Sequence, residues 1–215
     1  AATNAISDVY AMGGEPKLAL NIMCIPEAMT ADMVQELLRG GYDKAYEAGV
    51  IITGSEIYTG RIKDKFEPVV RAKLAHYPGE ILGVTICDDD LNMIVDTAKG
   101  YLAQGADFLI FTGGMSVDPD DLTPTAIRRL GAEIITHGVP AQPGNMTLVA
   151  YLGDVPILGV PGAAISMPTT IFDVLLPQIY AGDRLTHEDL IRLGDGGLCR
   201  LCKPCHFPNC TFGRY

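Results

Sequence analysis

From Val50 onward, short apolar segments of strand length alternate with segments whose apolar residues recur at helical spacing. Strand runs that are apolar along their whole length are typical of strands buried on both faces. The alternation therefore predicts an α/β fold, a three-layer αβα sandwich with a mostly parallel sheet. The expected strands are 50–53, 81–87, 107–112, 132–136 and 156–160, and the expected helices are 63–77, 91–103, 124–130 and 165–180.

The charge balance argues against two classes of partner. The formal net charge is −10, and neither nucleic acid nor an anionic membrane is expected to bind so acidic a chain, because both require a basic surface. A small anionic ligand stays open, since backbone N–H groups or a bound Mg²⁺ can hold a phosphate. No apolar run is long enough to span a bilayer and no leader-like segment opens the chain, so a cytoplasmic location is expected.

Four of the expected strands end in loops rich in glycine and acidic residues. In a parallel sheet these loops share one edge, where ligands bind. They contain Gly54-Ser55-Glu56, the acidic run 88–90, the stretch 112–124 and Pro161-Gly162.

The residue types in these loops favour a phosphate-bearing ligand with Mg²⁺. Glycines allow close approach of the backbone, and carboxylates can hold Mg²⁺. Thr123 as N-cap, with Pro124 in the first helical position, indicates a helix start whose dipole favours an anion. Each part also has a plainer interpretation, since a Gly-Gly pair is usually a turn and an aspartate run is often N-cap material. The shared edge is what favours the ligand site.

The segments "TGSEIYTGRIKD", "TGGMSVDPDDLTPTAI" and "ILGVPGAAI" resemble the molybdopterin-binding domain family of molybdenum-cofactor biosynthesis over residues 51–182. The family includes molybdopterin adenylyltransferases and molybdenum-insertion enzymes. The resemblance implies an enzyme that binds the dithiolene pterin phosphate and handles its adenylylated form with Mg²⁺. It also implies a homotrimer.

Matched positions assign roles to particular residues. Asp121 and Asp88 correspond to the family's functional acidic positions, which makes them the candidate catalytic residues. The candidate substrate-binding residues are Gly113, Gly114, Ser116, Thr123, Asp64, Glu56, Gly54, Pro161 and Gly162. Because the loop sequences mix features of both branches, adenylyl transfer from ATP and insertion of molybdate both stay open. A cofactor-binding or sensing module without catalysis is the alternative.

The segment "AATNAISDVYAMGGEPKLALNIMCIPE" instead resembles the start of the ATP-binding region of selenide, water dikinase (selenophosphate synthetase) over residues 1–54. The resemblance implies a vestigial Mg-ATP site at Asn4 and Asp8. The catalytic segments of that family are not found in this sequence, so selenophosphate synthesis is the less favoured function. The piece should form a strand at 18–24 and a helix at 30–48.

The sequence thus divides into a partial dikinase-like fragment, 1–50, a molybdopterin-binding domain, 51–182, and a tail, 183–215. The two patterns meet inside "GVIITGSEI". This junction favours a recombined or misassembled reading frame over an evolved fusion, which would retain two complete domains.

The tail is expected to contain a helix and a metal site. Cys199, Cys202, Cys205 and Cys210 place four thiols within twelve residues, which fits metal ligation in a reducing compartment. Such spacing can hold one tetrahedral ion or one iron–sulfur cube. The C-x2-C-x2-C run resembles ferredoxin ligation and favours a 4Fe–4S cluster, with Zn²⁺ as the alternative and His206 as a substitute ligand. Unrelated reduced thiols in a loose tail are the plainer interpretation.

Overall fold

The computed structural model describes residues 46–116 and 121–214. The chain divides into two compact units, Ala1–Asp43 and Lys44–Tyr215. The first unit lies outside the described residues, and with it the expected strand at 18–24, most of the expected helix at 30–48, and the positions Asn4 and Asp8. All of the described residues belong to the second unit.

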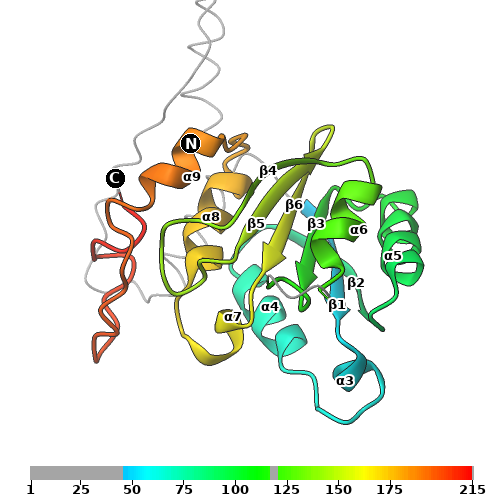
Figure 1. The fold of residues 1–215 in the computed structure, drawn as a ribbon. Helices are drawn as coiled ribbons and strands as arrows, with labels where there is room; N and C mark the ends of the chain where they lie inside the picture. Colours follow the sequence, from blue (N-terminus) through cyan, green and yellow to red (C-terminus); the bar gives the residue numbers. More distant parts are fainter. Residues whose placement is uncertain (1–45, 117–120, 215) are drawn as a thin grey trace, which may run out of the picture. The chain divides into compact units, whose positions relative to one another are not determined.

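A six-stranded sheet in the order β2-β1-β3-β6-β5-β4 forms the centre of this unit (Figure 1). The strands β1, β2, β3 and β6 are parallel, whereas β5 runs antiparallel to both β6 and β4. The bounds are β1 Tyr46–Thr53, β2 Gly79–Cys87, β3 Phe108–Thr112, β4 Glu133–His137, β5 Leu148–Leu152 and β6 Val155–Val160. The expected α/β fold with a mostly parallel sheet is confirmed.

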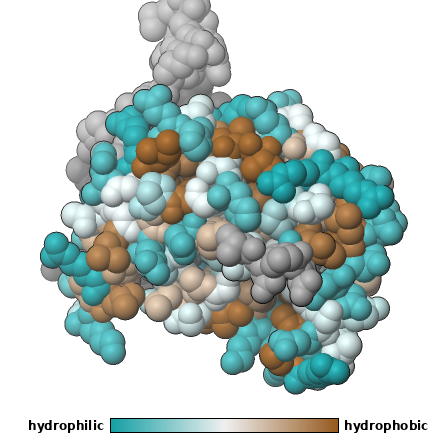
Figure 2. All heavy atoms as spheres, viewed as in Figure 1, coloured by the Kyte–Doolittle hydropathy of each residue, from teal (hydrophilic) through white to brown (hydrophobic). Residues whose placement is uncertain are grey.

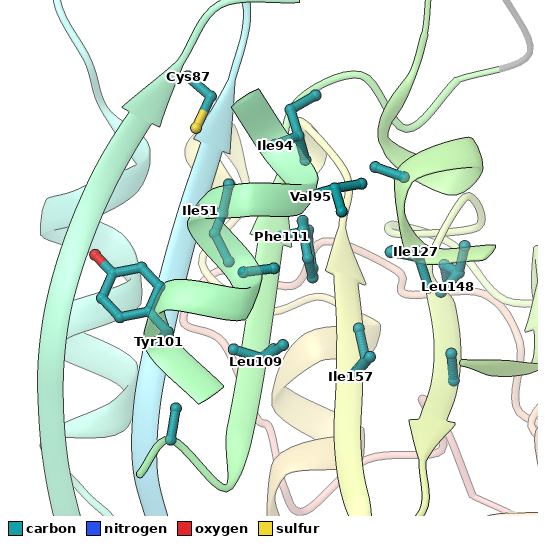
Figure 3. Packing of buried hydrophobic residues seen from close by; sticks show 14 of the residues in the cluster. Ile51, Cys87, Ile94, Val95, Tyr101, Leu109, Phe111, Ile127, Leu148 and Ile157 are labelled. Atoms are coloured by element: carbon teal, nitrogen blue, oxygen red, sulfur yellow. The ribbon is translucent and has the colours of Figure 1, made fainter. Parts of the chain in front are cut away.

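Helices cover both faces of the sheet, so the unit has three layers (Figures 1 and 3). Helices α5 and α6 lie on one face, and α4, α7 and α8 lie on the other. The bounds are α3 Ser55–Tyr58, α4 Phe66–Leu74, α5 Leu91–Ala103, α6 Thr123–Arg129, α7 Ala163–Ser166, α8 Ile171–Tyr180 and α9 His187–Arg192.

All side chains of strand β3 are buried. Because successive side chains of a strand point to opposite faces of the sheet, β3 contributes to a hydrophobic core on each face. Leu109 and Phe111 join the cluster under α5 and α6 (Figure 3). Phe108 points the other way, toward Tyr46 at 5.4 Å and Tyr180 of α8 at 6.2 Å between ring centroids. The apolar run of the sequence is therefore apolar because it contacts helices on both sides.

Three expectations about elements are wrong. The helix expected to reach residue 48 cannot include Tyr46–Ala48, because these residues pair with Gly79–Ile81 in the sheet. The single helix expected over 165–180 is two helices, since Thr170 and Asp173 form a capping box that starts α8. Strand β5 was not expected at all. Its residues are buried on both faces, so they lack the alternation that indicates a strand.

The surface carries no dominant apolar area on the face shown in Figure 2, where apolar residues form patches separated by polar ones. Among the described residues, no helix is both long and apolar enough to cross a membrane.

Candidate functional site at the carboxyl edge of the sheet

The register of the parallel strands brings the expected loops to one edge. Thr53 at the end of β1 pairs with Cys87 at the end of β2, and Thr112 at the end of β3 pairs with Val160 at the end of β6. This edge lies beside α3 and α7, at the bottom of the sheet in Figure 1. The loops after these four strands therefore start from one edge, as the sequence predicts.

A serine joins the first two loops. The hydroxyl of Ser55 lies 2.5 Å from Oδ1 of Asp88 and 2.9 Å from Oδ2 of Asp89. The backbone N–H of Ser55 also donates to Oδ2 of Asp89 at 2.9 Å. Two carboxylates are thus held side by side at the surface by one residue. Such a pair of oxygen ligands suits Mg²⁺ that also binds phosphate.

Two further aspartates of these loops, Asp90 and Asp64, each accept hydrogen bonds at the start of a helix. Asp90 caps α5 by accepting from the backbone N–H of Met93 at 2.7 Å. Asp64 accepts from the N–H groups of Phe66 and Glu67, both at 2.9 Å, at the start of α4. In this structure the Asp64 carboxylate is occupied by a helix end.

Hydroxyl groups lie beneath the loop after β3. The hydroxyls of Thr53 and Thr123 are 2.9 Å apart, and that of Thr123 donates to the carbonyl of Gly113 at 3.1 Å. Thr123 was expected to cap its own helix. It lies instead inside the first turn of α6, with Leu122 at the cap, because its hydroxyl is taken by the neighbouring loop.

The glycines of this loop are required by close packing. At Gly113, with φ of 82°, a Cβ would lie 2.1 Å from the carbonyl oxygen of Thr53. At Gly114, with φ of 53°, it would lie 2.8 Å from the Thr123 hydroxyl. Both a left-handed backbone and a lack of space exclude other residues. The turn and its close packing are therefore sufficient to explain why two glycines stand here.

Two further contacts fix the path of the same loop. Oδ2 of Asp121 accepts from the backbone N–H of Ser116 at 2.8 Å, which spans the stretch 117–120 that lies outside the described residues. Nε2 of His137, at the end of β4, lies 3.0 Å from the carbonyl oxygen of Met115. The side chain of Met115 occupies the space beside Gly159, where a Cβ would lie 2.2 Å from its methyl carbon.

The remaining candidates frame the edge. Gly54, with φ of 140°, leaves β1 and donates its N–H to the carbonyl of Cys87 at 3.2 Å. Glu56 is exposed in α3. Pro161 follows β6 and accepts from the N–H of Ala164 at 3.0 Å, and Gly162 precedes α7.

The tail cysteines lie away from this edge, after α9. Cys202 and Cys205 are exposed, and Cys199 and Cys210 are half-buried. A hydrogen bond from the Phe207 backbone, followed by one from the Thr169 side chain, holds the pKa of the Cys205 thiol below its usual value. Within residues 46–116 and 121–214, no group of three or more His, Cys, Asp or Glu side chains is arranged to hold a metal ion. Neither the carboxyl edge nor the tail presents a preformed ligand cage.

Sequence reasoning missed three contributors to the edge. Ser55 and Asp89 act through a contact between loops that only the pairing of β1 with β2 creates. His137 reaches the edge because β4 joins the sheet through the unexpected strand β5. The polar residues at strand ends were the available signal for all three.

A comparison with known protein families identifies the family of the segment that forms the carboxyl edge. The model of the family described as "Probable molybdopterin binding domain" matches residues 49–181, well over half of the chain. The chain belongs to this molybdopterin-binding family. The loops of the carboxyl edge all fall within the matched segment.

Solved structures show the same fold for the molybdopterin-binding domain. The molybdopterin biosynthesis enzyme MoaB from Thermus thermophilus is 18% identical with a TM-score of 0.50, covering 64% of this chain and 98% of that one. The tungsten cofactor synthesizing protein MoaB from Pyrococcus furiosus is 20% identical with a TM-score of 0.53, covering 64% and 94%. At these identities the likeness concerns the fold.

The amino-terminal segment has a different relationship. The N-terminal domain model of AIR synthase related proteins matches residues 1–72. The selenide, water dikinase of Treponema denticola is 65% identical over 54 residues, which are 25% of this chain and only 15% of that enzyme. The expected combination of a dikinase-like fragment with a molybdopterin-binding domain is confirmed.

Proposed function

We propose that the carboxyl edge binds the phosphate of molybdopterin and, with Mg²⁺, carries it through a step of molybdenum-cofactor biosynthesis. The observation that carries this proposal is the Ser55–Asp88–Asp89 network at the same edge as the Gly113-Gly114 turn. Carboxylates that face a phosphate site need a cation between the two charges. The choice of molybdopterin as the ligand rests on the family to which the chain belongs.

Each residue has a defined task in this proposal. Asp88 and Asp89 would hold Mg²⁺, which when bound neutralises phosphate charge and polarises its oxygens. Ser55 sets the separation of the two carboxylates through its hydroxyl and its N–H. Asp121 holds the Gly113–Ser116 turn in place through Ser116 and adds a third acidic group to the site. With its glycines, that turn lets the backbone approach the pterin phosphate.

Two reactions fit this arrangement, and both are phosphate chemistry. In adenylyl transfer, an oxygen of the pterin phosphate attacks the α-phosphorus of ATP, and pyrophosphate leaves. In molybdenum insertion, molybdate exchanges one oxygen for the two dithiolene sulfurs and releases it as water, and a water molecule cleaves the phosphoanhydride of the adenylylated pterin so that AMP leaves. Assays with ATP plus pterin, and with adenylylated pterin plus molybdate, separate the two by their products.

Asp88→Asn is the decisive variant. We expect turnover to fall roughly 10–100-fold, the scale of losses around metal ligands, while stability changes by about 0.5 kcal/mol or less because the side chain is at the surface. Asp154→Asn removes the same charge from the turn before β6, at the opposite edge, and should keep full turnover. Wild-type turnover in Asp88→Asn would refute the Mg²⁺ role. Pterin retention without either product would refute catalysis and identify a carrier or sensing module.

A further inference from the structure

The segment after α9 forms a loop that is closed at its base. We call residues 198–212 the cysteine loop, because they contain four of the chain's six cysteines. The N–H of Gly213 donates to the carbonyl of Gly196 at 2.9 Å. A Cβ on Gly196 would lie 1.9 Å from the carbonyl oxygen of Thr211, so the two ends of the loop are in direct contact.

The base of the cysteine loop is also tied to the body of the domain. The carbonyl of Gln142 accepts from the N–H of Cys199 at 2.9 Å, and the N–H of Gln142 donates to Gly197 at 2.6 Å. On the other side Phe212 is buried, with 3% of its surface exposed. The loop therefore starts and ends at fixed points.

Between these points the side-chain contacts of the cysteine loop include a hydrogen bond from Arg214 to the Pro208 carbonyl at 2.6 Å and the contact of Thr169 with Cys205 at 3.7 Å. The loop contains no helix or strand beyond one bridge at Leu198. Leu198 and Leu201 are 67% and 54% exposed, so its large aliphatic side chains do not build a core. Leu201 also has φ of 52°, a left-handed conformation that is unfavourable for leucine. Short segments without a core usually depend on disulfides or a metal ion.

The four cysteine residues border a common space. Cys199, Cys202, Cys205 and Cys210 all line one cavity of about 50 Å³ inside the loop. Their sulfur atoms are not at ligation distance from one point. Each cysteine, however, turns its sulfur about a single side-chain bond, and Cys202 and Cys205 are exposed, with the Cys205 sulfur 3.7 Å from the Thr169 hydroxyl. The four cysteines thus border one space, and binding an ion there requires rotation of their side chains.

We propose that the cysteine loop binds one Zn²⁺ through these four thiolates. Four sulfur ligands suit tetrahedral zinc, and a fully protein-coordinated ion is typical of a structural rather than a catalytic site. A single ion requires only the four side chains, whereas an iron–sulfur cube also requires four inorganic sulfides to fit among them. Zinc with four thiolates carries two negative charges, and Arg200 and Lys203 of the same loop offset them. The ion supplies the cross-link that the loop otherwise lacks.

Elemental analysis of the full chain, purified in reducing buffer with zinc and iron both present, tests this site. We expect a colourless protein with about one zinc per chain and neither iron nor acid-labile sulfide. The double variant Cys202→Ser/Cys205→Ser should lose about nine-tenths of the zinc, because only two thiolates remain. The matched control Cys87→Ala removes a thiol from the end of β2, outside the loop, and should keep the zinc.

A second measurement guards against misfolding. Both substituted thiols are exposed, so the double variant should keep the circular-dichroism spectrum and thermal unfolding of the rest of the domain. It should also be cut in the cysteine loop at least tenfold faster by protease, and we expect the same of the metal-free wild type. Iron with acid-labile sulfide would overturn the zinc assignment. A wild-type chain without bound metal, or zinc retained by the folded double variant, would overturn the site.

Discussion

At the residue scale, the most costly group at the carboxyl edge is the hydroxyl of Thr112. Among buried side-chain oxygen and nitrogen atoms of the described residues, it is the one without a hydrogen-bond partner. Burying a hydroxyl without a partner costs about 1–3 kcal/mol. We therefore expect Thr112→Val, which keeps the shape and removes the hydroxyl, to raise the free energy of unfolding by about 1 kcal/mol. Urea denaturation of the metal-free protein measures the change.

Thr123→Val is the matched control for this prediction. The Thr123 hydroxyl is also fully buried, but it contacts Thr53 and donates to Gly113. Its removal should lower the free energy of unfolding by about 1 kcal/mol. If both valine variants shift stability in the same direction, the difference between a satisfied and an unsatisfied hydroxyl is not what decides the outcome.

Tyr46 contributes to the loss of stability of the domain at alkaline pH. Burial, and then the charges of Asp107 and Tyr151, raise the pKa of Tyr46 from 10.0 to about 12. The unfolded chain releases this proton at lower pH than the folded one. The resulting stability is present below pH 10 and is lost as pH rises from there to about 12.

Tyr46→Phe should therefore change both the level and the slope of stability. The lost hydrogen bond from the phenol to the Ile179 carbonyl, 3.1 Å long, should cost about 1 kcal/mol at neutral pH. Between pH 10 and 12 the decline should be shallower by up to ~1.4 kcal/mol per pH unit. Urea titrations at several pH values measure it. Tyr58→Phe, at a side chain that is 48% exposed, should leave the slope unchanged, and an equal slope in Tyr46→Phe would contradict the assignment.

At the element scale, the start of α8 depends on one carboxylate. Asp173 completes the capping box with Thr170 and pairs with Lys73 of α4, whose side chain is only 14% exposed. Asp173→Asn weakens the cap and leaves a largely buried ammonium with the Pro168 carbonyl but without a carboxylate. We expect it to lower the free energy of unfolding by about 2–3 kcal/mol, measured by urea denaturation.

Helix α9 offers the comparison for this prediction. Its capping box of Thr186 and Asp189 has the same local geometry but is exposed and does not include a lysine. Asp189→Asn should cost about 1 kcal/mol or less. Equal losses in the two variants would show that the Lys73 contact contributes nothing.

The elements also show what the sequence could reveal. Helix α5 was expected at the bounds that it has, because Asp90 is a strong N-cap signal before an apolar helical repeat. Tyr46–Ala48 have residue types that continue a helix, yet pairing with β2 places them in a strand. Local propensity was overridden there by contacts with residues far along the chain. The Ser55–Asp88 contact was beyond reach for the same reason, although each loop was identified.

At the scale of the whole molecule, the boundary of the second unit lies before β1. The unit begins at Lys44, and Tyr46, buried against Phe108 and Tyr180, is its first described residue. A chain that begins at Lys44 should unfold at the temperature of the second unit in the full chain. A chain that begins at Gly49 loses the first three residues of β1 and a buried aromatic ring, which should cost about 3–5 kcal/mol.

Thermal unfolding of the two truncated chains beside the full chain checks this boundary. Equal stability of the Lys44 and Gly49 chains would show that Tyr46–Ala48 contribute little to the core. Aggregation of the Lys44 chain would show that Ala1–Asp43 is needed to fold the second unit.

The overlap of the two family matches falls on residues 49–72, so both include most of β1. This strand lies between β2 and β3 and pairs with each through its backbone, while residues 50–52 contribute buried β-branched side chains. Any protein family that contributes such a strand must meet the same few requirements. The backbone must be extended, and the side chains must be β-branched and uncharged. A genetic crossover inside this strand can therefore join segments of two families while the backbone pairing with β2 and β3 is kept. An interior strand of a sheet, usually regarded as a part of a protein least open to change, is here the place where two evolutionary histories could be spliced.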